Sequence, residues 1–398
     1  MNNNLAKRIK NQNGYRFTSL MEHKNKVINK NSDLLIDFGI GEQKSGAPKE
    51  VIDIINKEIQ TPINHLYSDN GIDEYKEKIS NYFKQEYDVY FDPKTEINHC
   101  IGIKSALTIL PLCFINPGDY VLMPRPAYVV LENMAKWLGA NIKYLDLKEE
   151  NNYLFNLNEI DEDILKKTKI LYINYPNNPT GAIATKDFYN HIIEYAKKYN
   201  FIIVNDAAYI DLTFDKKDKL SFMQVEGAKS VGVELHSFSK GYNMTGFRIG
   251  YVVGNKDIIK AFKLVKDNMD SGQFIPIQKG AMKALDCKEF IKQNGTKIKN
   301  RHIKFHEICK ENSLVTTIPK ATFYQFVRIP KEIEFNNNKI IINNANDFSL
   351  FLLNELKIMT IPYGNNVRFS MTFTENDEDE DRIFELFKKR ISKCKFRY

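Results

Sequence analysis

The sequence lacks long hydrophobic runs and is poor in cysteine. No uninterrupted apolar stretch reaches the roughly 18 residues of a membrane-spanning helix. The segment Met1 to Arg8 has no apolar core of a secretory signal, so we expect neither a membrane protein nor an exported one. The five cysteines are far apart and include no C-x-x-C pair, which argues against a disulfide framework or a zinc ribbon. We therefore expect a cytoplasmic protein without a metal site.

Neither sign of charge forms a long block. The 57 basic and 50 acidic residues leave a net charge of +7, and the two signs are interspersed along the 398 residues. A solvated mixed-charge surface explains this pattern better than a nucleic-acid-binding face does. The length is sufficient for a large core or for two domains.

The first two thirds of the sequence predict a mostly parallel sheet. Between about residues 48 and 285, helical patterns alternate with short apolar runs rich in β-formers, which is typical of βα units. We expect helices over 48–60, 72–86, 105–113 and 186–199, and buried strands over 120–123, 169–173, 201–204 and 249–253. Each run ends near a loop rich in Gly, Pro, Asn or Asp, where ligands of such sheets bind.

The pattern changes to an α+β arrangement after about residue 286. We expect helices over 288–312 and 379–393, with β-rich pieces over 322–329 and 367–372. The polar stretch 332–346 is interpreted as an exposed loop.

The segment from His236 to Gly250 carries the strongest chemical signal. Lys240 follows a short apolar strand, Ser237 and Ser239 precede it, and Arg248 comes eight residues later. An amine beside anion-binding groups is what a Schiff-base enzyme using pyridoxal phosphate requires. Taken alone, either the lysine or the arginine would be interpreted as a surface residue.

Two further motifs follow neighbouring predicted strands. The N-P-T-G turn over 178–181 follows one strand, and Asp206 and Tyr209 follow the next. The carboxylate can meet the ring nitrogen of a heteroaromatic ligand while the phenol meets a ring hydroxyl. The alternative for the N-P-T-G segment is a plain turn, and the alternative for Asp206 is a helix N-cap. Chance explains poorly why these two motifs and the Lys240 segment all occur at strand ends.

With these three motifs the sequence resembles the fold-type I pyridoxal-phosphate aminotransferases of class I and II over nearly the whole chain. The resemblance implies an α/β fold, the PLP-dependent transferase fold. Its large domain, over 46–285, has a mostly parallel seven-stranded sheet flanked by helices. Its smaller α+β domain is formed by both chain ends, 1–45 and 286–398.

The resemblance also implies roles for individual residues. Lys240 holds the cofactor covalently and moves the proton between the substrate Cα and the cofactor C4′, while Asp206 pairs with the ring nitrogen. Asn178 and Tyr209 are implied to bind the ring's 3-oxygen. The implied catalytic residues are Lys240, Asp206 and Tyr209, and the implied cofactor-binding residues are Ile103, Lys104, Tyr128, Asn178, Asp206, Tyr209, Ser237, Ser239, Lys240, Arg248 and Tyr67.

Other implied contacts concern the partner subunit and the substrate. Tyr67 corresponds to a tyrosine that reaches the phosphate in the neighbouring subunit, which implies a homodimer; a packing tyrosine is the alternative. Arg368 corresponds to the arginine that binds the substrate α-carboxylate, and a surface strand arginine is its alternative. Ile40 and Gly41 belong to a glycine-rich segment that lines the same carboxylate, and Asn178 is expected to contact the substrate as well.

Three segments, 239–246, 268–274 and 319–324, resemble the LL-diaminopimelate aminotransferase subgroup. We therefore predict ping-pong, ketimine-type transfer of an amino group between an amino acid and a 2-oxo acid, with LL-diaminopimelate and 2-oxoglutarate as candidate substrates. The segments 42–48 and 361–367 depart from the subgroup, which leaves aspartate or aromatic aminotransferase as alternatives. A β-eliminating lyase on the same fold, or a non-catalytic binding module that keeps it, is a further alternative.

Overall fold

The computed structural model describes residues 6, 8, 35–374 and 377–398. The chain divides into two compact units, which we call the large unit and the small unit. The large unit holds Glu42–Ile303 and Ile318–Tyr324, and the small unit holds the other described residues. Most of the predicted contribution of residues 1–45 to the small domain lies outside the described residues. The exact domain boundaries at 45/46 and 285/286 stay a prediction.

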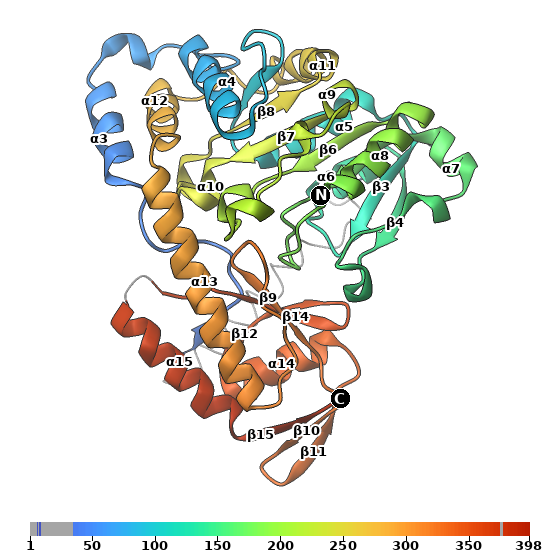
Figure 1. Cartoon of the computed structure of the whole chain (residues 1–398), viewed down its shortest axis with the longest axis vertical. Helices are drawn as coiled ribbons and strands as arrows, with labels where there is room; N and C mark the ends of the chain where they lie inside the picture. Colours follow the sequence, from blue (N-terminus) through green and yellow to red (C-terminus); the bar gives the residue numbers. More distant parts are fainter. Residues whose placement is uncertain (1–5, 7, 9–34, 375–376) are drawn as a thin grey trace. The chain divides into compact units, whose positions relative to one another are not determined.

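A seven-stranded sheet forms the centre of the large unit (Figure 1). The strands lie in the order β2-β8-β7-β6-β5-β3-β4, and β8 alone runs antiparallel to its neighbours. The predicted mostly parallel seven-stranded sheet is therefore confirmed. The strand bounds are β2 Ile97–Cys100, β3 Tyr120–Arg125, β4 Asn141–Asp146, β5 Thr168–Ile173, β6 Ile202–Asp206, β7 Gly232–Ser237 and β8 Gly250–Gly254.

The central strands of the sheet are buried because their side chains are largely apolar. Ile203 and Val204 on β6 point to opposite faces of the sheet, and both are fully buried. Leu171 on β5 and Val233 and Leu235 on β7 are buried apolar residues as well. Strands that are apolar on both faces are stable where helices cover both faces.

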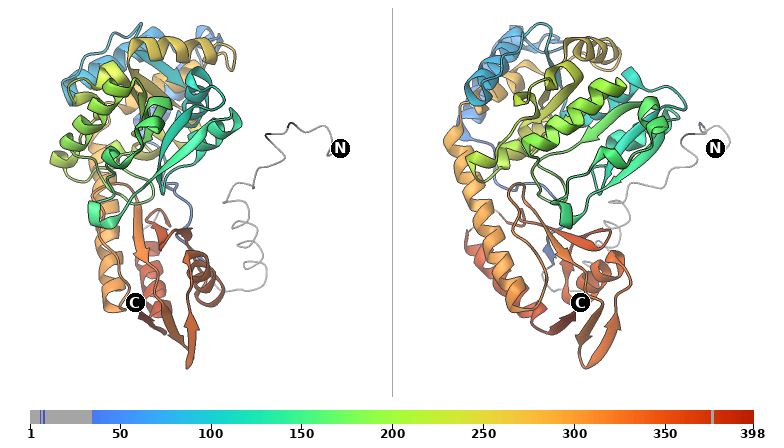
Figure 2. Two further views of the ribbon diagram at one scale, coloured as in Figure 1. Left: turned by 90° about the vertical axis from the view of Figure 1, so that its right-hand side faces the viewer. Right: turned by 45° about the vertical axis from the view of Figure 1, so that its right-hand side comes forward.

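Helices lie on both faces of this sheet (Figures 1 and 2). The helices α5 and α11 contact β7 and β8, whereas α8 contacts β6 and α9. The helix α8 begins where the Thr185 hydroxyl accepts a hydrogen bond from the Phe188 N–H, and it ends at Asn200 in the left-handed conformation. The helix bounds are α3 Lys49–Glu58, α4 Asp73–Tyr87, α5 Ile103–Phe114, α6 Val130–Trp137, α7 Glu162–Lys167, α8 Lys186–Tyr199, α9 Ala228–Val231, α10 Phe238–Gly241, α11 Lys256–Lys266, α12 Ile275–Ala284 and α13 Lys288–Glu311.

The small unit has a core of aromatic rings. Phe38 lies at the centre, with the rings of Phe305, Phe369, Phe373 and Phe387 at centroid distances of 5.1–5.9 Å. The elements around it are β1 Ile36–Asp37, β9 Tyr324–Arg328, β10 Glu332–Phe335, β11 Asn338–Ile341, α14 Ala345–Leu356, β12 Ile358–Met359, β13 Ile361–Tyr363, β14 Asn366–Ser370, α15 Asp377–Ile391 and β15 Cys394–Arg397. No helix in the described part of the chain is both long enough and apolar enough to cross a membrane.

The loop predicted over 332–346 is wrong for most of its length, because 332–341 form a hairpin and α14 begins at Ala345. There β10 and β11 form an antiparallel hairpin, and β10 also pairs with β15. The alternation of polar and apolar residues buries Ile333, while Asn336 and Asn337 take positive φ angles of 51° and 62° at the turn. Two consecutive left-handed residues are what a tight hairpin turn needs, and asparagine tolerates them. The asparagine-rich composition therefore marks a turn between two strands.

Candidate active site

Three neighbouring strands bring the predicted chemical groups to one edge of the sheet. The strands β5, β6 and β7 are parallel neighbours, so the residues that follow their carboxyl ends are close in space. Asp206 is the last residue of β6, Lys240 lies on α10 directly after β7, and Asn178 lies in the turn after β5. The large unit thus assembles the lysine, the aspartate and the N-P-T-G turn.

Asp206 is a buried carboxylate with two hydrogen-bond donors. Its Oδ2 accepts a hydrogen bond from the Tyr172 hydroxyl at 3.0 Å, and its Oδ1 accepts one from the Ala208 N–H at 3.2 Å. Burial raises the pKa of Asp206 to about 6, although these hydrogen bonds and the charges of Lys240 and His236 act in the opposite direction. A cation placed against this carboxylate therefore stabilises its charged form.

The turn after β5 is tied to Asp206 through one asparagine. The Asn174 side chain donates to the backbone carbonyl of Asp206 at 2.6 Å and accepts from the Asn178 N–H at 2.8 Å. Gly181, at φ 72°, closes the turn, and a Cβ atom there would lie 2.4 Å from the Cβ of Pro319. Asn178 therefore has a fixed position relative to Asp206.

Tyr209 lies three residues after Asp206, at the start of the short helix η5 (Ile210–Leu212). Its hydroxyl is 3.2 Å from the hydroxyl of Tyr324, and both side chains are buried. The ring of the neighbouring Phe323 lies 5.8 Å from the Nζ of Lys240. The segment Ile318–Tyr324 therefore reaches the same group of residues from far along the sequence.

Arg248 lies against the N-terminus of α5. A Cβ atom at Gly102, which precedes this helix at φ 65°, would lie 2.4 Å from the Nη2 of Arg248. The guanidinium also donates to the Thr245 carbonyl at 2.7 Å and to the Ser239 hydroxyl at 3.5 Å. Because a helix N-terminus and a guanidinium both favour anions, these groups together form a cradle of the kind that binds phosphate.

The other residues predicted to contact the cofactor have varied surroundings. Ser237 accepts a hydrogen bond from the Ser239 N–H at 3.1 Å, and Ile103 and Lys104 are the first two residues of α5. Tyr128 is half-buried. Burial and the charge of Asp206 raise the pKa of Tyr172, and the nearby Tyr128 phenol raises it further. Tyr67 is 85% exposed on the surface of the large unit, so no contact there explains the presence of an aromatic ring.

The small unit brings together Arg368, Ile40 and Gly41, whereas Asn178, which is also predicted to contact the substrate, belongs to the large unit. Arg368 on β14 is 2% exposed, and its Nη2 donates to the Gly39 carbonyl at 2.9 Å. The Thr372 hydroxyl donates to the Ile40 carbonyl at 2.8 Å, which fixes the segment that continues to Gly41. The arginine and the glycine-containing segment are therefore neighbours within this unit.

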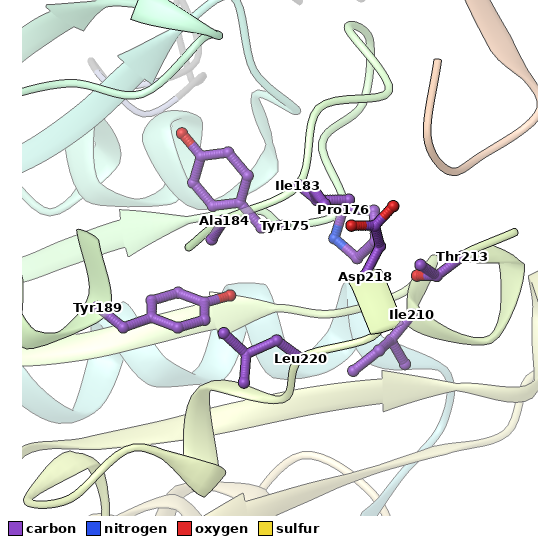
Figure 3. Close-up of a pocket in the computed structure, with 9 residues that line it drawn as sticks. All are labelled: Tyr175, Pro176, Ile183, Ala184, Tyr189, Ile210, Thr213, Asp218 and Leu220. Atoms are coloured by element: carbon purple, nitrogen blue, oxygen red, sulfur yellow. The ribbon is translucent and has the colours of Figure 1, made fainter. Parts of the chain in front are cut away.

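A cavity between the segments on either side of the N-P-T-G turn and α8 is too small to hold an amino acid (Figure 3). It has a volume of about 10 Å³, which is room for one water molecule. Tyr175 and Pro176 line it from before the turn, Ile183 lines it from after the turn, and Tyr189 lines it from α8. None of the residues predicted to contact cofactor or substrate is among those that line it.

Sequence patterns alone do not assign Tyr172, Asn174 and Tyr324 to this group. Tyr172 lies in an apolar run that predicts only a buried strand, and Asn174 directly follows that run. For Tyr172 and Asn174 the one available signal is their spacing of two residues. Side chains two positions apart in an extended segment lie on the same face, and both of these side chains donate to Asp206 on the neighbouring strand β6.

Comparisons with known proteins agree with this geometry. The family model for aminotransferase class I and II matches residues 34–381. The chain is 42% identical to an LL-diaminopimelate aminotransferase of Methanocaldococcus jannaschii, over 95% of this chain and 92% of that protein, and 40% identical to one of Methanococcus maripaludis, over 96% and 94%. The substrate-bound structure of BacF from Bacillus subtilis is similar with a TM-score of 0.90 and 31% identity, covering 99% of each chain.

The fold and the lysine, aspartate and anion-binding groups define a pyridoxal-phosphate-dependent enzyme. The chain belongs to the class I and II aminotransferase family. It transfers an amino group between an amino acid and a 2-oxo acid. The residues present fit the cofactor. The buried carboxylate of Asp206 can pair with a cationic ring nitrogen, and the N-terminus of α5 together with Arg248 can bind a phosphate.

Proposed function

We propose that the enzyme transfers an amino group from LL-diaminopimelate to 2-oxoglutarate. The observation that carries this proposal is the match to LL-diaminopimelate aminotransferases at 40–42% identity over more than nine tenths of both chains. The segments 42–48 and 361–367 distinguish this chain from the subgroup pattern, so the side-chain specificity is what the experiment must test.

We propose that the groups of the large unit act on the cofactor and on the reacting proton. When bound, pyridoxal phosphate supplies an electron sink for the electron pair of the broken Cα–H bond. The Lys240 amine holds the cofactor and then carries the proton from the substrate Cα. Asp206 keeps the ring nitrogen protonated, and Asn178 and Tyr209 hold the 3-oxygen.

We propose that the phosphate lies in the cradle of the large unit. Arg248 offers a planar fork of N–H donors, and Ile103 and Lys104 begin α5, whose N-terminus favours an anion. Ser237 and Ser239 add hydroxyl donors beside Lys240. Tyr128 is assigned to the face of the ring, which suits its half-buried side chain.

We propose that Arg368 binds the α-carboxylate of the substrate in bidentate fashion. A guanidinium has five N–H donors, and the contact with the Gly39 carbonyl uses one of them, which orients the group. Burial of Arg368 strengthens its attraction for a carboxylate. Ile40 and Gly41 contribute backbone groups to the same carboxylate.

We propose that the enzyme works as a homodimer through the surface that carries Tyr67. Exposed apolar side chains gather in two segments there, with Ile63, Leu66 and Tyr67 in one and Met269 and Phe274 in the other. The segments are joined, since the Ser68 hydroxyl donates to the Gln273 carbonyl at 2.6 Å. An exposed apolar surface of this kind supports a two-fold interface.

We propose a cytoplasmic location. All five cysteines lie in the described part of the chain, and each is a free thiol. Free thiols are typical of a reducing compartment.

The substrate is tested with purified enzyme, 2-oxoglutarate and a panel of amino donors. We expect LL-diaminopimelate to give the highest kcat/KM, with glutamate as product. A higher value with aspartate or an aromatic amino acid would contradict the substrate and leave transamination in place. Release of ammonia and pyruvate from a donor with a β leaving group, without glutamate, would instead indicate the lyase.

A further inference from the structure

Tyr172 contacts the carboxylate that is assigned to the cofactor ring. It is fully buried on β5, and its hydroxyl donates to the Oδ2 of Asp206 at 3.0 Å. The ring of a phenylalanine would fill the same space, so packing does not account for the hydroxyl. A buried hydroxyl is retained without cost only where it has a hydrogen-bond partner, and here that partner is the carboxylate.

We propose that Tyr172 is a positioning residue that keeps Asp206 ionised, and thereby keeps the ring nitrogen of the cofactor protonated. The proposal rests on the role proposed above for Asp206. A proton between a carboxylate and a ring nitrogen has two positions, and a donor to the carboxylate favours the charged pair. Loss of that donor moves the proton toward Asp206, which makes the ring a weaker electron sink.

The other groups that face Asp206 do not replace this donor. Lys240 on α10 and, when protonated, His236 on β7 act to lower the pKa of Asp206 through their charge. However, the Nε2 of His236 lies 2.7 Å from the Oε1 of Glu234, a buried carboxylate that offsets a charge on the imidazole. Lys240 would no longer present a free ammonium group to Asp206 once it holds the cofactor. In the loaded enzyme the donors that persist are therefore the Ala208 N–H and the Tyr172 hydroxyl.

Removal of the hydroxyl leaves Asp206 in place. Its backbone is held by the Asn174 side chain at 2.6 Å and by the pairing of β6 with β5 and β7, and its Oδ1 is held by the Ala208 N–H. Tyr172→Phe therefore changes the charge equilibrium of the carboxylate and not its position. This separates an electrostatic role from a packing role.

The test compares Tyr172→Phe with the matched control Tyr175→Phe. Tyr175 is a buried tyrosine of the same chain segment, but its hydroxyl donates to the Tyr153 carbonyl at 2.7 Å instead of to Asp206. The first readout is the affinity of each apoenzyme for pyridoxal phosphate as a function of pH. Protonation of Asp206 opposes binding of a cationic ring, so the affinity should fall at low pH. We call this fall the acid limb, and we expect its midpoint in Tyr172→Phe to lie about one pH unit higher than in the parent enzyme, a tenfold change in the protonation equilibrium. In the control we expect the midpoint of the parent enzyme.

The second readout is the chemical shift of ¹⁵N-labelled cofactor, which reports the protonation of the ring nitrogen directly. We expect Tyr172→Phe to lie between the parent enzyme and Asp206→Asn. Identical acid limbs and identical shifts in Tyr172→Phe and the parent would overturn the proposal. An unchanged shift in Asp206→Asn would instead overturn the role of Asp206 itself, so the two failures are distinguishable.

A third variant covers the case in which Tyr172→Phe does not fold. Fluorotyrosine placed at position 172 keeps the ring and makes the hydroxyl a stronger donor. We expect its acid limb to move to lower pH, opposite in sign to the phenylalanine variant. An unchanged or higher acid limb in the fluorotyrosine enzyme would contradict the proposal.

Discussion

Replacement of Asp206 by asparagine should make the apoenzyme more stable and the loaded enzyme far less active. Asparagine has nearly the same shape as aspartate, and the Tyr172 hydroxyl can turn from donor to acceptor when it faces an amide N–H. The substitution therefore removes the buried charge and little else. Both consequences follow from the surroundings of this one carboxylate.

The stability effect has a definite sign and pH range. An acid whose pKa is higher in the folded chain than in the unfolded chain holds its proton more tightly when folded, so it disfavours folding as the pH rises between the two values. For Asp206 the pKa rises from its ordinary value of 3.8 to about 6, which corresponds to about 3 kcal/mol lost above pH 6. Well below pH 3.8 the loss vanishes. We expect apo Asp206→Asn to be more stable than the parent by up to this amount at pH 8 and equal to it near pH 3.

The activity effect has the opposite sign. The charge that destabilises the apoenzyme is the one that holds the ring nitrogen protonated, so its loss should lower kcat by at least about 100-fold, the size of effect that follows removal of one electrostatic contact to a reacting group. Thermal melts of the apoenzyme at the two pH values and steady-state kinetics of the loaded enzyme measure both quantities. A melt at pH 8 that is no higher than the parent's would refute the buried-charge argument, and a kcat within twofold of the parent's would refute the catalytic role.

Three further predictions concern the lysine, the phosphate cradle and the dimer. Lys240→Ala should abolish fixation of the cofactor by borohydride, and fixation at another lysine would contradict the assignment. Gly102→Ala should weaken binding of pyridoxal phosphate more than binding of pyridoxal, because the new Cβ would lie 2.4 Å from the Nη2 of Arg248; the control Gly246→Ala, which meets open space, should bind both as the parent does, and equal effects on the two ligands would show that the cradle does not hold a phosphate. Mixing inactive Tyr67→Ala and Lys240→Ala subunits should restore activity in some heterodimers, and mixtures that stay inactive after verified subunit exchange would indicate that Tyr67 serves its own subunit or none.

The sequence predicted the sheet because its strands are defined by local composition. Runs such as 169–173 and 201–204 are apolar on both faces, and only a sheet covered on both sides buries such runs. The hairpin β10–β11 was missed for the converse reason. Glu332, Glu334 and Lys339 on its strands are charged and its turn is Asn-Asn, so composition alone resembles a loop. The alternation that buries Ile333 spans only four residues.

The residues of the candidate site also fall into two groups, those that local composition predicts and those that only the sheet arrangement shows. Asp206, Lys240 and Asn178 could be predicted because each follows a strand in a polar, turn-forming segment, and polar residues at strand ends stand out against the apolar run before them. Tyr172 could not, because a tyrosine inside an apolar run has the same appearance whether its hydroxyl meets water, a carbonyl or a carboxylate. Its partner is decided by which strand lies beside β5 and in which register. Tyr172 pairs with Val204, two residues before Asp206, and a shift of one residue would turn its side chain to the other face of the sheet. Residues proposed to contact the cofactor can therefore be predicted from local motifs, whereas a residue proposed to act on them from a neighbouring strand requires the sheet order and register.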